Sequence, residues 1–168
     1  MELEQKVYNF AHEYLHYDPE GGQLSWNKRP PRSKVSVGNE VGSLDKDGYR
    51  RFTIMGKQYI AARIVWLMFN KKFPSGQIDH INNERLDNRI ENLRDVTPQQ
   101  NAFNRKRKVC NSSGYKGVSF HKRDKKWQAT IEYNGKVRFL GYFAKPEDAH
   151  KAYCNAAEKA YGEYCNFG

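Results

Sequence analysis

The dipeptide Asn134-Gly135 constrains the fold most strongly, because it lies between two segments in which polar and apolar residues alternate, 126–133 and 136–143. Asn-Gly readily adopts the left-handed backbone of a two-residue turn between antiparallel strands. Alternating side chains suit a strand, whose residues point in turn to its two faces. The sequence therefore predicts a β-hairpin over these residues.

The residues around this hairpin predict a third strand and a covering helix. Residues 115–120 are strand-like, Pro146 followed by two acidic residues is typical of a helix start, and Gly162 is typical of a helix end. Small and aromatic residues recur at helical spacing; they are Ala149, Ala152, Tyr153, Ala156, Ala157 and Ala160. We expect a three-stranded antiparallel sheet packed on one helix that continues to about Tyr161.

A base, a carboxylate and amide groups occur together in the middle of the chain, at Asp79, His80, Asn92 and Asn101. Hydrolysis of a phosphodiester needs a base that deprotonates water and a cation that neutralises charge on the phosphate and the departing oxygen. Mg²⁺ prefers oxygen ligands and keeps several waters, so one carboxylate and one amide oxygen can suffice. We expect a nuclease site with His80 as the base and Asp79 and Asn101 as the metal ligands.

The local sequence predicts how these side chains meet. Residues 77–81 alternate as in a short strand, and Asn82-Asn83 turns the chain. Thr97-Pro98 is typical of a helix start, which puts Asn101 in the first turns of a helix. A strand, a loop and a helix would then converge on one metal ion. Turn formation and helix capping are the structural alternatives for each of these polar residues taken singly.

Four segments between Tyr59 and Arg105 form a specific pattern: Ala62-Arg63-Ile64-Val65-Trp66, Pro74-Ser75-Gly76-Gln77-Ile78-Asp79-His80-Ile81, Asn88-Arg89-Ile90-Glu91-Asn92-Leu93-Arg94 and Gln100-Asn101. This pattern resembles the HNH homing endonucleases of phages and introns. The resemblance implies an α+β fold with a ββα-metal site that binds Mg²⁺ or Mn²⁺. It makes His80 the general base and Asn92 the residue that pins the loop carrying His80. It also implies Asp79 and Asn101 as metal ligands.

Two positions depart from the usual pattern of this family. Asn101 stands where the third motif residue is often His, a change that the intron-type branch tolerates. Ala62 stands where many members have His before Arg63.

The amino-terminal part is joined to this nuclease domain. Residues 3–15 have roughly helical apolar spacing, and 23–26 and 48–54 are strand-like around a loop rich in Pro and Gly. Residues 61–70 predict a buried helix, with core residues Trp66, Met68 and Phe69. We expect a nuclease domain over 1–104, a basic linker over 105–113 and a second domain over 114–168.

Six segments mark the second domain: Tyr115-Lys116-Gly117-Val118, Trp127-Gln128-Ala129-Thr130-Ile131, Leu140-Gly141-Tyr142-Phe143, Glu147-Asp148-Ala149, Ala152-Tyr153 and Asn166-Phe167. They are similar to the plant ethylene-response-factor (APETALA-type) DNA-binding domain. The resemblance implies a sheet that enters the major groove of duplex DNA. Ser119 and Glu132 stand where the plant domains often have Arg, so the resemblance concerns the fold more than the preferred DNA sequence.

The chain is basic, with 29 Lys and Arg against 19 Asp and Glu and a formal net charge of +10. Such an excess predicts an anionic partner, DNA or RNA, and both the sheet module and the nuclease motif favour duplex DNA. The candidate DNA-binding residues are Arg63, Arg105, Lys106, Arg107, Lys108, Lys116, Lys122, Arg123, Lys125, Lys126 and Arg138. The alternatives are a nuclear localisation signal at 105–108 and side chains that only keep the surface soluble.

Other sequence features bear on the compartment and the partners. With no apolar segment long enough to span a membrane and no secretory leader, we expect the cytoplasm, that of a bacterial host if a phage encodes the chain. Cys110, Cys154 and Cys165 lack zinc-like spacing and predict free thiols. We expect neither a membrane partner nor a small-molecule substrate, and a monomer, with a dimer as the alternative.

These features predict a site-specific, metal-dependent DNA endonuclease that nicks duplex DNA by attack of His-activated water. A regulatory DNA-binding protein that keeps a degenerate HNH scaffold is the main alternative. A zinc protease is a third hypothesis, because His12-Glu13-Tyr14-Leu15-His16 matches the His-Glu-x-x-His motif. Asp18-Pro19 would end such a helix almost at once.

Overall fold

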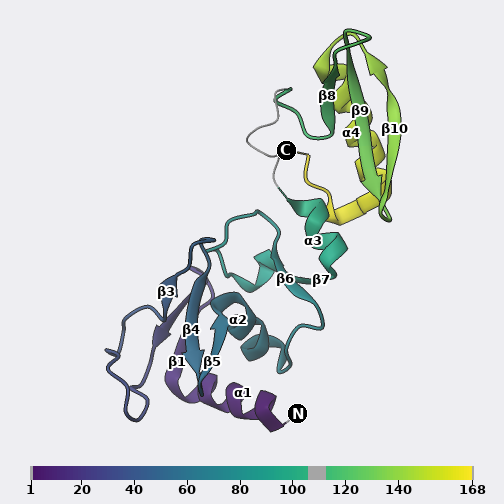
Figure 1. The fold of residues 1–168 in the computed structure, drawn as a ribbon. Coiled ribbons are helices and arrows are strands. Elements are labelled where there is room, and N and C mark those ends of the chain that lie inside the picture. Colours follow the sequence, from purple (N-terminus) through teal and green to yellow (C-terminus); the bar gives the residue numbers. More distant parts are fainter. Residues whose placement is uncertain (1, 106–112, 168) are drawn as a thin grey trace. The chain divides into compact units, whose positions relative to one another are not determined.

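The computed structural model describes residues 2–105 and 113–167. The chain divides into two compact units, which meet in the sequence between Pro98 and Gln99. Both contain helices and small antiparallel sheets (Figure 1). The fold is therefore a mixed helix and strand fold, as the sequence predicts. Among the described residues, no helix combines the length and the apolar character that crossing a membrane requires.

The first unit begins with a helix and a hairpin. Helix α1 (Glu2–Tyr14) leads directly into β1 (Leu15–Asp18), which pairs antiparallel with β2 (Gln23–Trp26). Leu15, Leu24 and Trp26 are buried in the core of this unit. The amphipathic spacing of α1 places Val7 and Ala11 in the same core.

A three-stranded sheet and a second helix complete this core. Strands β3 (Ser43–Leu44), β4 (Arg50–Ile54) and β5 (Lys57–Ile60) are antiparallel, and α2 (Ala61–Asn70) follows β5 without a break. Helix α2 is the most apolar helix of the unit, and it buries Ile64, Val65 and Leu67. Trp66 and Met68 are partly buried against the core, but Phe69 is 64% exposed, so its predicted core position is wrong. It lies in the last turn, where the helix leaves the core.

The remaining elements of the first unit form a hairpin with a long connection. Strand β6 (Gln77–His80) pairs antiparallel with β7 (Leu93–Val96). The loop between them ends in a short 3-10 helix, η1 (Ile90–Asn92). The predicted strand at 77–81 is confirmed, and it ends at His80.

The second unit contains the predicted three-stranded sheet and its helix. The strands are β8 (Val118–His121), β9 (Lys126–Tyr133) and β10 (Lys136–Phe143), in the order β10-β9-β8. Both Asn134 and Gly135 have positive φ, 52° and 69°, which is the turn that the dipeptide predicts. Helix α4 (Pro146–Tyr161) covers one face, and a 3-10 turn, η2 (Gly162–Tyr164), follows it.

Two details of this unit differ from the expectation or add to it. Strand β8 begins at Val118 rather than at residue 115. The hydroxyl of Ser113 accepts a hydrogen bond from the amide of Tyr115 and donates to the carbonyl of Val118, and these bonds hold the residues in a turn.

Helix α3 (Pro98–Asn104) packs on this unit through Phe103. Cys154 and Cys165 are free thiols, and Cys110 lies outside the described residues.

Candidate active site

The end of β6 buries two ionisable side chains next to each other. Asp79 is 6% exposed and His80 is 4% exposed. The Asp79 carboxylate forms an ion pair with Arg94, which is its partner across the β6–β7 ladder. Nε and Nη2 of Arg94 both donate to Oδ2 of Asp79, each at 2.8 Å. The pair compensates the cost of burying either charge alone.

His80 is held by a buried amide. Its Nε2 lies 3.0 Å from Oδ1 of Asn88, a side chain that is also buried. Burial lowers the pKa of His80 below its ordinary value, although the hydrogen bond to Asn88 acts in the opposite direction. The imidazole is therefore neutral near pH 7. Because Oδ1 can only accept, Nε2 carries the proton and Nδ1 carries the lone pair, as a general base requires.

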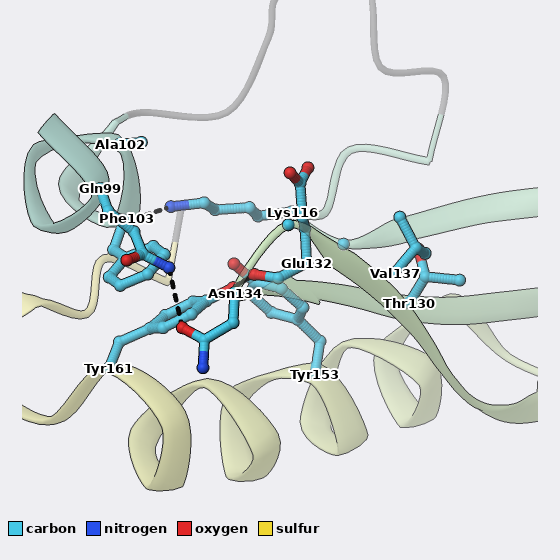
Figure 2. A pocket seen from close by; sticks show the side chains of 12 residues that line it. Gln99, Ala102, Phe103, Lys116, Thr130, Glu132, Asn134, Val137, Tyr153 and Tyr161 are labelled. Atoms are coloured by element: carbon cyan, nitrogen blue, oxygen red, sulfur yellow. Dashed lines mark hydrogen bonds between the residues drawn. The ribbon is translucent and has the colours of Figure 1, made fainter.

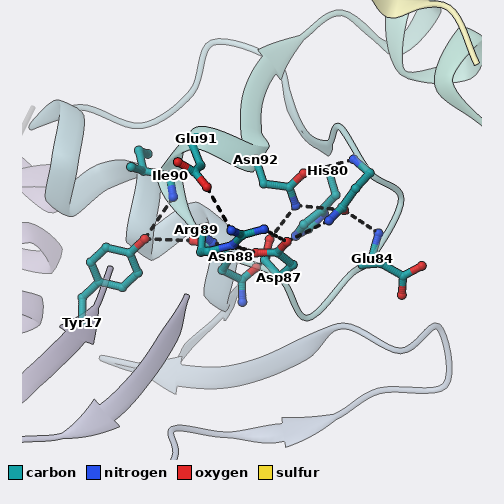
Figure 3. Close-up of polar contacts among 10 residues, drawn as sticks. Tyr17, His80, Glu84, Asp87, Asn88, Arg89, Ile90, Glu91 and Asn92 are labelled. Atoms are coloured by element: carbon teal, nitrogen blue, oxygen red, sulfur yellow. Dashed lines mark hydrogen bonds and ion pairs between the residues drawn. The ribbon is translucent and has the colours of Figure 1, made fainter. Parts of the chain in front are cut away.

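Asn92 organises the loop that follows His80 (Figure 3). Its Oδ1 accepts a hydrogen bond of 3.0 Å from the amide of Asn82, and its Nδ2 donates to Oδ1 of Asn82 at 2.9 Å and to the carbonyl of Asp87 at 2.8 Å. The carbonyl of Asn92 accepts from the amide of Ile81. One buried side chain thus joins both ends of the loop.

An ion pair between two residues of the same loop also stabilises it. Both carboxylate oxygens of Asp87 accept hydrogen bonds from the guanidinium of Arg89, at 2.8 and 2.7 Å. This contact lowers the pKa of Asp87 to about 2. Glu91 is a second and more exposed partner of Arg89.

The amino-terminal hairpin supports the loop from the other side. The hydroxyl of Tyr17, on β1, donates to the carbonyl of Asn88 at 3.2 Å and accepts from the amide of Ile90 at 3.0 Å. The turn after β1 packs so closely that a Cβ on Gly22 would lie 2.5 Å from the backbone nitrogen of Arg89. Gly22 also has a φ of +70°, so both the space and the backbone favour glycine.

The other predicted metal ligand lies on the next helix. Asn101 is in the first turns of α3, as the sequence predicts. From Gln99 onward α3 belongs to the second unit. Ala62, which replaces a common family His, is buried in the core on α2.

The predicted DNA-binding residues fall into different environments. Five of the predicted residues are exposed on the second unit: Lys122, Arg123, Lys125, Lys126 and Arg138. Arg105 is exposed just after the end of α3. Arg63 is partly buried and donates to the carbonyl of Gly76 at 3.0 Å. Lys106, Arg107 and Lys108 lie outside the described residues.

Lys116, another predicted DNA-binding residue, has contacts within the second unit. Its ammonium group donates to the carbonyls of Phe103, Arg105 and Asn166, at 2.9, 2.7 and 2.8 Å. An ammonium has three N–H donors, so all of them are engaged inside the protein. Lys116 is a structural lysine in this unit.

The zinc-protease hypothesis is wrong on geometry. His12 lies in α1, but His16 lies in β1, so the two side chains are not one turn apart on a helix. Across residues 2–105 and 113–167 there is no group of three or more His, Cys, Asp or Glu side chains that could hold a metal ion.

Comparison with known proteins identifies the nuclease segment. A family model described as HNH endonuclease matches residues 59–103, which include β6, the loop and β7. The chain carries an HNH endonuclease domain. An HNH endonuclease of Acanthamoeba polyphaga mimivirus is 33% identical over 122 residues, 72% of this chain and 63% of that protein. Protein 3.8 of Escherichia phage T7 is 34% identical over 92 residues, 54% of this chain and 74% of that protein.

The HNH domain supports a nuclease or DNA-binding role. The chain spans less than two thirds of the length of the mimivirus relative. No solved structure matches the chain.

The donor groups of the HNH domain suit a hard cation. The predicted ligands are a carboxylate, on Asp79 in the first unit, and an amide, on Asn101 in the second, and the described residues hold no cluster of three or more His, Cys, Asp or Glu. Oxygen ligands suit Mg²⁺ or Mn²⁺ rather than zinc. The Asp79 carboxylate already has one cationic partner, Arg94.

Several residues around the HNH site have no role in the motif pattern. Asn88, Arg94 and Tyr17 contact His80, Asp79 and the loop, respectively. Arg94 follows from strand register, because an antiparallel hairpin closed by residues 81–92 pairs it with Asp79. Nothing in the local sequence signals Tyr17, which lies 71 residues before Asn88.

Tyr17→Phe should destabilise the first unit. The change leaves the carbonyl of Asn88 and the amide of Ile90 without the hydroxyl that joins them, and we expect a loss of about 1–2 kcal/mol in the free energy of unfolding. Urea unfolding measures it. Tyr8→Phe, in the same unit, is the control and should change stability by less than about 0.5 kcal/mol. Equal losses in the two variants would contradict the bridging role of Tyr17.

Asp87→Asn should cost stability in a way that depends on pH. The folded pKa of Asp87, about 2, lies below the ordinary value of 3.8, so its contribution is complete above about pH 4 and disappears as pH falls toward 2. Since Arg89 is partly exposed, we expect a difference from the parent protein of about 1 kcal/mol near neutral pH. Unfolding midpoints across this pH range measure it.

Glu91→Gln removes the more exposed partner of Arg89 and is the control, with little expected effect at any pH. A cost of Asp87→Asn that stayed constant down to about pH 2 would rule out the ion pair as its cause.

Proposed function

We propose that this protein is a site-specific, divalent-metal-dependent DNA endonuclease of the HNH homing type, with a ββα-metal site. The observation that carries the proposal is the state of His80, which is buried, neutral and oriented by Asn88 at the end of β6. Histidine side chains are seldom fully buried, so the burial of His80 beside a buried amide is unusual. A general base needs both a lone pair at neutral pH and a fixed direction.

In the proposed reaction, Nδ1 of His80 takes a proton from water as the water oxygen attacks phosphorus. The bond from phosphorus to the 3′-oxygen breaks, and the departing oxygen takes up a proton from solvent water, which leaves 5′-phosphate and 3′-hydroxyl ends. Asn92 holds the loop behind the imidazole, and Asn88 keeps the proton on Nε2. The catalytic assignment is thus His80, with Asn92 as the residue that fixes its loop.

Asp79 and Asn101 are the proposed ligands of the ion, Mg²⁺ or Mn²⁺. When bound, the ion supplies charge neutralisation for the phosphate and for the departing oxygen. Arg94 fixes the Asp79 carboxylate from the side of β7. It also lowers the negative charge that an incoming phosphate would meet.

We assign DNA positioning to the second unit. Its candidate contacts are the exposed basic residues Lys122, Arg123, Lys125, Lys126 and Arg138, together with Arg105 and the basic run 106–108 that follows it. Strand β10 also exposes Val137, Phe139 and Tyr142, which are suited to apolar contacts with bases and sugars. The resemblance to the plant ethylene-response-factor domain supports the same assignment. In this proposal residues 1–104 cut and residues 114–168 hold the DNA.

One such site per chain favours a nick in one strand by a monomer. A double-strand break would need a dimer or two successive events. We propose that the protein acts on duplex DNA in the cytoplasm of a bacterial host, if a phage encodes it.

A regulatory DNA-binding protein with an inactive HNH scaffold is the second candidate, and the buried Asp79–Arg94 pair favours it. A carboxylate that is already paired can stabilise a fold without binding metal. Plasmid cleavage separates the two, because pure binding retards the DNA on a gel without cutting it.

His80→Ala should lower metal-dependent cleavage about 100-fold or more and leave DNA binding intact, because a positioned base contributes this much to proton transfer. The assay is nicking of supercoiled plasmid that carries the genomic neighbourhood of the gene, in Mg²⁺ or Mn²⁺ and in chelator. His16→Ala, an exposed histidine on β1, is the control and should cut normally. Full activity in His80→Ala would refute the assigned base, whereas DNA binding without cleavage by the parent protein would favour the regulatory alternative.

A further inference from the structure

Helix α3 is too short to be stable alone. It comprises the seven residues from Pro98 to Asn104. Isolated helices shorter than about 12 residues are marginal in water, so most of the stability of α3 must come from its contacts. Asn101 lies on this helix, and its position therefore depends on whatever holds α3 in place.

The first contact is an aromatic stack. The ring of Phe103 lies parallel to the ring of Tyr161, with centroids 3.8 Å apart and an interplanar angle of 14°. Tyr161 is the last residue of α4, and its hydroxyl donates to the carbonyl of Glu132 on β9 at 2.5 Å. Through one side chain, Phe103 joins α3 to the helix and the sheet of the second unit (Figure 2).

The second contact is the ammonium group of Lys116. Two of its three acceptors, the carbonyls of Phe103 and Arg105, are at the carboxy-terminal end of α3, where helix carbonyls lack intrahelical partners. A cation at this end also opposes the helix dipole. Burial lowers the pKa of Lys116, which is the cost of placing the charge there. The third acceptor, the carbonyl of Asn166, ties the same group to the end of the chain.

A cavity lies beside these contacts, between α3 and the sheet. It has a volume of about 780 Å³, with Gln99, Ala102 and Phe103 on one side and Thr130 and Glu132 of β9 on the other. At the start of the helix, Nε2 of Gln99 donates to Oδ1 of Asn134 at 3.0 Å, but this bond is exposed. Phe103, packed on the core of the second unit, and the ammonium group of Lys116 are thus two contacts that hold α3 there.

From these contacts we propose that the second unit positions the helix that carries Asn101, with Lys116 and Phe103 as positioning residues for the nuclease reaction. The inference rests on the proposed function, in which Asn101 supplies an oxygen to the metal ion. It gives the second unit a role beyond holding DNA, because the same unit sets one metal ligand. Lys116 touches neither substrate nor ion in this proposal; it acts through α3.

The test compares Lys116→Met with Lys159→Met in the full chain. Methionine keeps most of the length of Lys116 and removes its donors, and Lys159 is an exposed lysine on α4 of the same unit. Hydrogen exchange reports on α3 directly. We expect faster exchange of the amides of residues 102–104 in Lys116→Met, unchanged exchange in β9 and β10, and no change anywhere in Lys159→Met.

Cleavage kinetics then test the positioning role. The concentration of Mg²⁺ or Mn²⁺ at half-maximal cleavage should rise about 10- to 100-fold in Lys116→Met, as for other residues that orient a metal ligand. The dissociation constant for DNA should stay within about twofold, since the three donors of the Lys116 ammonium group are engaged by carbonyls. Phe103→Leu, which keeps an apolar side chain but removes the stack on Tyr161, should shift both readouts in the same direction.

Two results would overturn the inference: normal exchange of α3 in both Lys116→Met and Phe103→Leu, or a freed α3 with an unchanged metal requirement. A parent protein that cuts with neither metal would instead refute the proposed function. The exchange measurement needs no cleavage, so it decides in that case whether Lys116 clamps α3.

Discussion

The side chain of Asn92 is the interaction on which the candidate site depends. The loop between β6 and β7 is rich in polar residues and cannot be stabilised by an apolar core of its own. Buried polar groups cost free energy unless they are hydrogen-bonded, and Asn92, at the end of the loop, satisfies groups at its start and in its middle. Once the loop is closed, Asn88 reaches His80 and the imidazole has one direction and one tautomer. The chemistry proposed for His80 is thus a consequence of how a loop is closed.

The second unit uses charge in a similar way. A lysine normally keeps its ammonium group in water, and burying it is costly. The ammonium group of Lys116 donates hydrogen bonds to three carbonyls, which offset the free-energy cost of its burial. Two of these carbonyls are at the end of a short helix that has little stability of its own. The basic residues of the chain therefore include side chains exposed on the surface and one side chain, Lys116, that stabilises the fold.

The sequence predicts the regular elements well because their signals are local. Asn134-Gly135, Pro146 and Gly162 mark a turn and the two ends of a helix through backbone preferences that need no distant partner. The strand end at His80 and the helix that carries Asn101 follow from equally local patterns.

Contacts made at long range are not predictable in this way. Tyr17 and Gly22 meet the loop only after the chain has folded, and the engagement of Lys116 depends on where α3 ends relative to the sheet. Phe69 is apolar and at a suitable helical position, but its exposure depends on where the core ends.

The contact between the first hairpin and the loop means that the folding unit is longer than the sequence motif. The family match begins at residue 59, yet the hydroxyl that joins Asn88 to Ile90 comes from Tyr17, and the turn at Gly22 fills the space against Arg89. A fragment cut at the motif boundary would keep every residue of the proposed chemistry. It would lose the contacts that shape the loop, and a minimal HNH domain excised from this chain therefore has to begin before β1.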